Sequence, residues 1–238
     1  MGRAYEVRKA SIQKTGAAKA KLYSMYAREI YQAAKVGGTD PVSNVTLKRL
    51  IEKSKKEQVP SDIVKRAIDK VNSGIDENYD EVRYEIFGPS GSNLIVVCFT
   101  DNVNRSLSSI RTALNKCDSK MGAQGSVSYM YDHLSIVSFK GLSEEETLEA
   151  LIENGIDIDD IEKDNENVVV YGIPKDLYKI KEVINTKLGN IEFDVDEITM
   201  LPKEKIKLSG DDLDHFKKLL IMLDDIEDVQ NVYHNVEL

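Results

Sequence analysis

Lysine and arginine side chains crowd the first third of this 238-residue chain. Residues 1–72 contain 16 Lys+Arg and 7 Asp+Glu, a local net charge of +9, whereas residues 73–238 contain 16 and 34, a net charge of −18. Gathered cations attract polyanions, and near a phosphate backbone they bind by releasing counterions, largely without reading base sequence. These residue types therefore predict a phosphate-binding surface in the first third of the chain.

A helix that positions some of these cations is predicted from about Ala17 to Lys35. Its apolar side chains recur at i, i+4 and i+8 from Leu22, so cations spaced by seven residues from Lys21 align on another face. The alternative interpretation is an ordinary solvated basic surface. The candidate nucleic-acid-binding residues are Arg8, Lys9, Lys14, Lys19, Lys21, Arg28, Lys35, Lys48, Arg49 and Arg105.

Two more helices complete a small basic domain over residues 1–74, whose first 16 residues form an arm without a clean apolar period. The second helix is predicted to run to about Glu57, with start signals at Asp40-Pro41 and at Asn44, and the third carries Val64 and Val71 on its apolar face. The second and third helices also allow a helix-turn-helix interpretation, with Lys65 and Arg66 on the second element. Plain packing of three helices explains the same pattern.

Strand signals begin near residue 80. Val82–Phe87 and Ser92–Thr100 flank Gly88–Gly91, a hairpin turn by composition. We expect a helix over residues 105–116 and a strand over Ser126–Tyr131. Residues 134–201 then follow the order β-α-β-β-α-β, which is ferredoxin-like, and its first helix opens on Ser143 with the spacing of a capping box.

The C-terminal tail supplies one helix, Asp211–Asp224, and one strand, Val229–Val236, without partners of their own. We therefore expect them to fold back onto residues 80–132. The predicted fold class is α+β, with an N-terminal three-helix domain and two α/β domains with antiparallel or mixed sheets, the third ferredoxin-like and inserted in the second. The expected domains are residues 1–74, residues 80–132 plus 204–238, and residues 133–203.

Three local motifs have both a functional and a structural interpretation. Gly88–Gly91 has the spelling of a phosphate clamp, but such a clamp joins helices, so a hairpin turn is favoured. In Asp101–Arg105 an asparagine is expected to cap the following helix, which leaves Arg105 for phosphate. Tyr129 and Tyr131 alternate onto one face of the predicted strand and could stack on bases, although a core face is favoured.

No constellation for catalysis or metal binding is recognised, so neither an enzymatic activity nor a cofactor is expected. The three histidines, the last of them His234, are scattered, and Cys98 and Cys117 lack the spacing of a zinc site. The carboxylate runs at Asp157–Asp160 and Asp224–Asp228 lack the glycine of a calcium loop and are interpreted as solvated faces. A second interpretation is that the acidic domains face a basic protein partner.

The chain is expected to be cytosolic. No run of residues reaches the 18 uncharged apolar positions of a membrane span, so no membrane partner is expected. The first 30 residues are basic but contain no apolar core of a secretory signal.

Several segments taken together resemble the YebC/PmpR family. They are RYEIFGPSG at Arg83–Gly91, TDNVNR at Thr100–Arg105, GSVSYMY at Gly125–Tyr131, REI at Arg28–Ile30, QVP at Gln58–Pro60 and DVQNVYHN at Asp228–Asn235. The resemblance covers nearly the whole chain in order. The opening lacks the Gly-His-Ser-Lys-Trp start of the larger branch and is closer to a shorter-headed subgroup.

This resemblance implies a three-domain, non-enzymatic regulator in the cytoplasm. The family is described as DNA-binding transcriptional regulators, whereas its mitochondrial relatives activate translation and bacterial members have been linked to stalled ribosomes. Two hypotheses therefore remain open. The first is a DNA-binding transcriptional regulator, and the alternative is a translation factor that binds ribosomal RNA.

Overall fold

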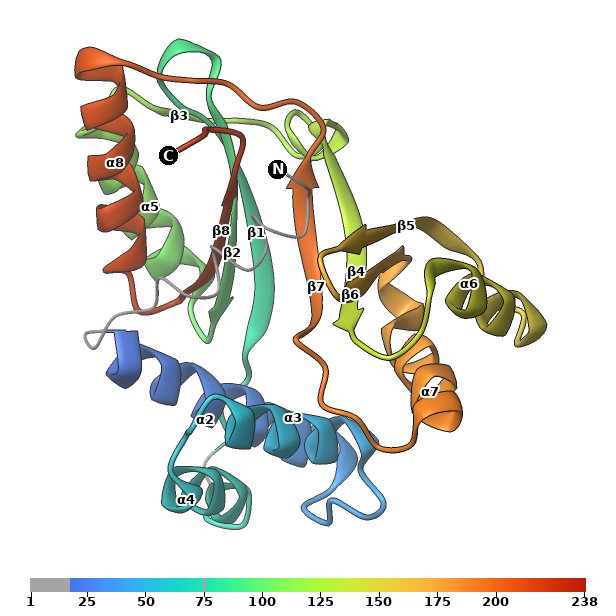
Figure 1. Ribbon diagram of the computed structural model, residues 1–238. Coiled ribbons are helices and arrows are strands. Elements are labelled where there is room, and N and C mark those ends of the chain that lie inside the picture. The colour runs from blue at the N-terminus through green and yellow to red at the C-terminus, as the bar shows by residue number, and fades with distance from the viewer. Residues whose placement is uncertain (1–17, 75) are drawn as a thin grey trace. The chain divides into compact units, whose positions relative to one another are not determined.

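The computed structural model describes residues 18–74 and 76–238 (Figure 1). These residues fall into two compact units, one built from residues 130–203 and the other from the described residues before and after them. The fold class is α+β, as the sequence predicted, with two four-stranded antiparallel sheets and seven α-helices in the described ranges.

Three helices form the first part of the larger unit, and all three were predicted. They are α2 (Ala18–Gly37), α3 (Val45–Lys56) and α4 (Ser61–Val71). Asn44 begins α3, because its side-chain oxygen accepts the Leu47 amide at 3.0 Å while its nitrogen donates to the carbonyl oxygens of Ala33 and Gly38 at 2.8 Å. The three helices enclose an apolar core around Ile30 and other buried side chains.

A four-stranded sheet, in the order β3-β1-β2-β8, forms the second part of this unit. Its elements are β1 (Asp80–Phe87), the turn η1 (Pro89–Gly91), β2 (Asn93–Thr100), α5 (Val103–Asn115), β3 (Lys120–Met121), α8 (Gly210–Asp224) and β8 (Val229–His234). Helices α5 and α8 cover one face (Figure 1), where Ile110 and Phe216 are fully buried with Cys98. The tail folds back as predicted, because β8 pairs antiparallel with β2.

The strand predicted over Ser126–Tyr131 is wrong. The structure has a 3-10 turn, η2 (Ser128–Met130), and β1 pairs instead with the two-residue β3. The reason is the carboxylate of Glu85, which accepts the backbone amides of residues 125, 127 and 128 and so removes them from any sheet ladder. Tyr129 and Tyr131 therefore share no strand face: the first is 64% exposed, and the second is buried at the start of β4.

The smaller unit has the predicted ferredoxin-like order, with a sheet in the order β5-β6-β4-β7. Its elements are β4 (Tyr131–Phe139), α6 (Glu144–Glu153), β5 (Ile158–Asp164), β6 (Asn167–Gly172), the turn η3 (Pro174–Asp176), α7 (Leu177–Leu188) and β7 (Val195–Pro202). The capping box is confirmed, since Ser143 accepts the Glu146 amide at 3.2 Å and Glu146 accepts the Ser143 amide at 2.8 Å. Helices α6 and α7 bury Leu151 and Ile180 against this sheet.

Candidate nucleic-acid interface

Helix α3 presents a face of cations. Its twelve residues include five basic side chains and a single acidic one. Lys48 and Lys55, seven positions apart, are exposed, and Arg49 is half-buried beside them. Leu47 and Ser54 point to the opposite side of the helix and are fully buried. The apolar spacing thus fixes one face in the core and leaves the basic face toward solvent.

Other exposed cations belong to the two flanking helices. Lys19 is exposed in the first turn of α2, and Lys65 and Arg66 are exposed on α4. The Nε atom of Arg66 donates to the Asp62 carbonyl oxygen at 3.1 Å, one turn earlier on the same helix. Three further candidates, Arg8, Lys9 and Lys14, lie outside the described residues.

Two of the aligned cations on α2, Lys21 and Lys35, form ion pairs with carboxylates of the same chain. The ammonium of Lys21 pairs with a carboxylate oxygen of Asp224 at 3.0 Å. Lys35 pairs with Asp76 and donates to the Glu77 carbonyl oxygen at 2.8 Å and to the Asn78 side-chain oxygen at 2.6 Å. Lys21 and Lys35 are aligned along α2 as predicted, but their ammonium groups contact the end of α8 and residues 76–78.

The other two candidates, Arg28 and Arg105, converge on Asp228. A guanidinium nitrogen of Arg28 lies 3.1 Å from one oxygen of this carboxylate, and a nitrogen of Arg105 lies 2.8 Å from the same oxygen. The hydroxyl of Ser106 donates to the second oxygen at 2.8 Å. Arg28 also pairs with Glu227 at 2.7 Å. The structure thus brings together two candidate residues that lie 77 positions apart in the sequence.

Asp228 was interpreted as part of a solvated acidic run, and that interpretation is wrong, because its side chain is only 5% exposed. Burial disfavours its charged form, but the hydrogen bonds from Arg105 and Ser106 and the charge of Arg105 outweigh burial, so the pKa of Asp228 lies below its ordinary value. Asp224, Asp225 and Glu227 in the same run are exposed. Asp228 is therefore an ionised, internally bonded carboxylate.

The segment that follows α4 is held by its own aromatic and acidic groups. The hydroxyl of Tyr79 donates to the Glu77 carboxylate at 2.7 Å, which also pairs with Lys70 at 2.6 Å. The ring of Tyr79 stacks on Phe99 with a centroid distance of 5.4 Å and meets the ring of Tyr31 edge-on at 6.2 Å. Residues 76–79 thus have a fixed course between α4 and β1.

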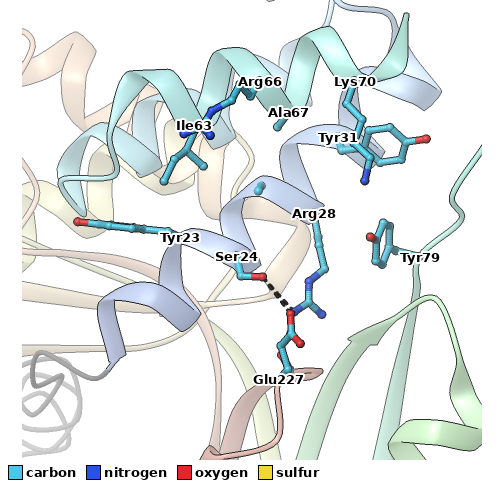
Figure 2. A pocket seen from close by; sticks show the side chains of 11 residues that line it. Tyr23, Ser24, Arg28, Tyr31, Ile63, Arg66, Ala67, Lys70, Tyr79 and Glu227 are labelled. Atoms are coloured by element: carbon cyan, nitrogen blue, oxygen red, sulfur yellow. Dashed lines mark hydrogen bonds and ion pairs between the residues drawn. The ribbon is translucent and has the colours of Figure 1, made fainter. Parts of the chain in front are cut away.

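A cavity of about 480 Å³ opens between these groups (Figure 2). Figure 2 shows Tyr23, Ile63 and Arg66 on one side of it, Tyr31, Lys70 and Tyr79 on the other, and Arg28 with Glu227 between them. Aromatic rings and cations therefore line the same space. Arg28 was predicted from the sequence as a candidate, but the cavity was not, because its walls come from segments far apart in the chain.

The remaining motifs have structural roles. Gly88–Gly91 is the predicted hairpin turn, with the Gly88 amide donating to the Ser92 carbonyl oxygen at 2.8 Å. Asn102 caps α5, because its side-chain oxygen accepts the Arg105 amide at 3.0 Å. Among residues 18–74 and 76–238, no three His, Cys, Asp or Glu side chains are grouped as metal ligands. No helix in those ranges has the length and apolar character needed to cross a bilayer.

Two family models match the chain. The TACO1/YebC protein N-terminal domain matches residues 3–74, and the TACO1/YebC second and third domain matches residues 79–236. A probable transcriptional regulatory protein of Marinobacter nauticus is 48% identical over 238 residues, covering 100% of this chain and 99% of the relative. One of Alcanivorax borkumensis is 45% identical, with 100% of both chains covered.

A solved structure is similar over nearly the same length. The crystal structure of a conserved hypothetical protein from Aquifex aeolicus has a TM-score of 0.73 and 34% sequence identity to this chain. The similarity covers 94% of this chain and 92% of that one.

Proposed function

Because the chain belongs to the TACO1/YebC family, we propose that it is a regulatory protein that binds nucleic acid, with DNA as its target and transcription as the process it regulates. Its relatives carry the name probable transcriptional regulatory protein. The single observation that carries the proposal is the basic face of α3, where five cations stand against one carboxylate.

The proposed contact surface consists of exposed and half-buried cations of the three helices. Lys48 and Arg49 of α3 are its centre, and Lys19 of α2 extends it. Lys21, Lys35 and Arg105 are left out because carboxylates of the chain already neutralise them. A surface of this kind contacts phosphates and does not discriminate base sequence. Sequence preference, where it exists, would need other groups.

We also propose that the chain divides into domains at residues 1–74, 80–132 plus 204–238, and 133–203. Three separate apolar cores support this division. One lies among α2, α3 and α4, one between α5, α8 and the first sheet, and one between α6, α7 and the second sheet. Residues 76–79 connect the helices to β1.

The test is a salt titration of binding. Fluorescence anisotropy with labelled duplex DNA should show the affinity falling by about three to five decades between roughly 50 and 200 mM salt if six to ten phosphates are contacted. A flat response would exclude the phosphate surface. Association with ribosomes on a sucrose gradient, together with no protection of promoter DNA, would move the target to RNA.

A matched pair of variants locates the surface. Replacing Lys48 and Lys55 by alanine removes two exposed cations from α3, and replacing Lys217 and Lys218 removes two exposed cations from α8. Each phosphate contact contributes about 0.9 to the slope of log affinity against log salt, so the first variant should lower the slope by about 1.8. The second should leave it unchanged. Equal effects would show that net charge alone drives binding.

A further inference from the structure

The cavity beside α2 combines the features of a nucleotide site. Its volume of about 480 Å³ lies within the range of small-ligand pockets. Its walls hold three tyrosine rings, the two arginines Arg28 and Arg66, and Lys70. Proteins bind unpaired nucleotides with this combination, because a base stacks on an aromatic ring while a cation receives the phosphate.

One wall of the cavity is already rigid. The hydroxyl of Tyr31 accepts the Glu77 amide at 3.2 Å, and the hydroxyl of Tyr79 is bound to the Glu77 carboxylate. Both rings are therefore held in place, with Phe99 stacked behind Tyr79. A ligand that contacts these rings does not have to immobilise them, so binding avoids that entropy cost. Tyr23, on the opposite side, is half-buried and offers ring surface.

The cavity lining includes one exposed carboxylate, that of Glu227, which is bound to a cation. One oxygen of Glu227 accepts a guanidinium nitrogen of Arg28 at 2.7 Å and the hydroxyl of Ser24 at 3.2 Å. The Glu227 side chain is 74% exposed, whereas Asp228 behind it is buried and keeps Arg28 oriented through the other guanidinium nitrogen. A phosphate oxygen has the same hydrogen-bonding requirements as this carboxylate oxygen. Glu227 can turn to solvent without breaking the buried pair.

We propose that this cavity binds one unpaired nucleotide of a nucleic acid, with the base against Tyr23 and the phosphate at Arg28 and Ser24 in place of the Glu227 carboxylate. The proposal rests on the proposed nucleic-acid binding and adds a preference for unpaired over paired strands. A base in a duplex is stacked on its neighbours and cannot enter a cavity of this size. Arg66 also lines the cavity and supplies a further donor.

The test compares two neighbouring carboxylates in the full-length protein. Glu227→Gln and Asp225→Asn each remove one exposed negative charge from the turn between α8 and β8. Affinities are measured by anisotropy for a labelled single-stranded oligonucleotide and for a blunt duplex at one salt concentration. Glu227→Gln should tighten single-strand binding several-fold more than Asp225→Asn and leave the duplex affinity equal in both variants. Equal effects on the single strand would overturn the phosphate position.

A second pair of variants tests the base position. Tyr23→Leu removes the ring and Tyr23→Phe retains it, so a difference between them reports stacking. Because stacking contributes about 1–3 kcal/mol per base, Tyr23→Leu should weaken single-strand binding by roughly 5- to 150-fold, and Tyr23→Phe by less than about twofold. Thermal unfolding of both variants checks that each is folded. If Tyr23→Leu weakens duplex and single strand alike, the cavity does not hold a base.

A competition experiment shows whether the cavity binds a nucleotide within a nucleic acid strand or a free nucleotide. A nucleoside monophosphate should displace the single strand only weakly, because it lacks the phosphates that contact α3. If the monophosphate binds as tightly as the oligonucleotide, the occupant is a free nucleotide and the proposal is overturned. A flat salt response of the wild-type protein would instead reject nucleic-acid binding as a whole. A steep response with no effect of the four variants would reject the cavity alone.

Discussion

A guanidinium nitrogen of Arg28 lies 3.1 Å from a carboxylate oxygen of Asp228, although 200 positions separate the two residues in the chain. Arg105 and Ser106 donate to the same carboxylate. Helices α2 and α5 and the turn before β8 therefore meet at one buried charge. Because the carboxylate of Asp228 is buried away from water, the folded protein is stable only while these partners stay bound to it.

Asp228→Asn should destabilise the protein by roughly 2–3 kcal/mol, which urea unfolding measures. Asparagine has the same shape but leaves the charges of Arg28 and Arg105 without their shared counterion. Removing one partner of a fully buried pair costs about 3–5 kcal/mol. The expected value is lower here because the Arg105 side chain is 51% exposed.

Asp225→Asn is the control for this change. It removes the same charge three positions earlier, from an exposed side chain, and should alter the free energy of unfolding by less than about 0.5 kcal/mol. Equal destabilisation by both variants would show that the acidic turn acts through its net charge and that the buried network contributes nothing of its own.

The stabilisation from Asp228 should disappear in acid. Its pKa in the folded protein lies below the ordinary value of 3.8, since hydrogen bonds from Arg105 and Ser106 outweigh the opposing effect of burial. The folded state therefore binds fewer protons than the unfolded chain, so the stabilisation is complete above the ordinary pKa and is lost as pH falls through the lower, folded value.

The measurement is the difference in unfolding free energy between wild type and Asp228→Asn as a function of pH. This difference should be constant from pH 7 to about pH 5 and should shrink below about pH 4. Other carboxylates with lowered pKa values, such as Glu85, contribute equally to the pH dependence of both proteins, so their contributions cancel in the difference. A difference that already shrinks near pH 6 would contradict the assignment.

Most of the fold could be predicted because its signals are local. The apolar period of α2 and the capping box of α6 lie within single elements, and the tail was assigned to the first sheet because it had no other partner. The failure at Ser126–Tyr131 has a non-local cause. Its alternating pattern is typical of a strand, but the Glu85 carboxylate, 40 positions from Gly125, takes the backbone amides that a strand would need. The two-residue β3 is too short to have a period.

The cations of the candidate site could be predicted from the sequence, but the groups that they contact could not. Helical spacing correctly aligned Lys21 and Lys35, but spacing does not tell what lies opposite a helix face, and carboxylates lie there. Asp228 sits in a run of acidic residues whose other members are exposed, so composition gave no sign of its burial. The cavity walls come from α2, α4, Tyr79 and Glu227, which no local pattern connects.

Glu85 should order the loop that follows β3. Its carboxylate accepts the Gly125 amide at 2.6 Å and the Ser128 amide at 2.9 Å, as well as the Val127 amide. Glu85→Ala should leave these amides without their acceptor and cost about 1–3 kcal/mol. Hydrogen exchange should show protection lost at residues 125, 127 and 128.

The conservative variant separates charge from shape at this site. Glu85→Gln keeps one acceptor oxygen and should lose less stability than Glu85→Ala, because bonds to a charged acceptor are the stronger ones. Burial opposes ionisation of Glu85, but the amide hydrogen bonds outweigh it and lower its pKa, so the loop should stay protected until the pH falls below the ordinary value of 4.5. Unchanged exchange in Glu85→Ala would mean that the loop is ordered by other contacts.

Single replacements on α2 and α3 should affect different quantities: one changes the salt dependence of binding and the other only the stability. Lys48→Ala removes an exposed cation of the proposed surface and should lower the slope of log affinity against log salt by about 0.9. Lys21 is already paired with Asp224, so Lys21→Ala should leave that slope unchanged and cost at most about 1 kcal/mol of stability, since the Asp224 side chain is 75% exposed. Anisotropy titrations and urea unfolding measure the two quantities. If Lys21→Ala lowers the slope as much as Lys48→Ala, the pair with Asp224 opens on binding, and the phosphate surface extends along α2.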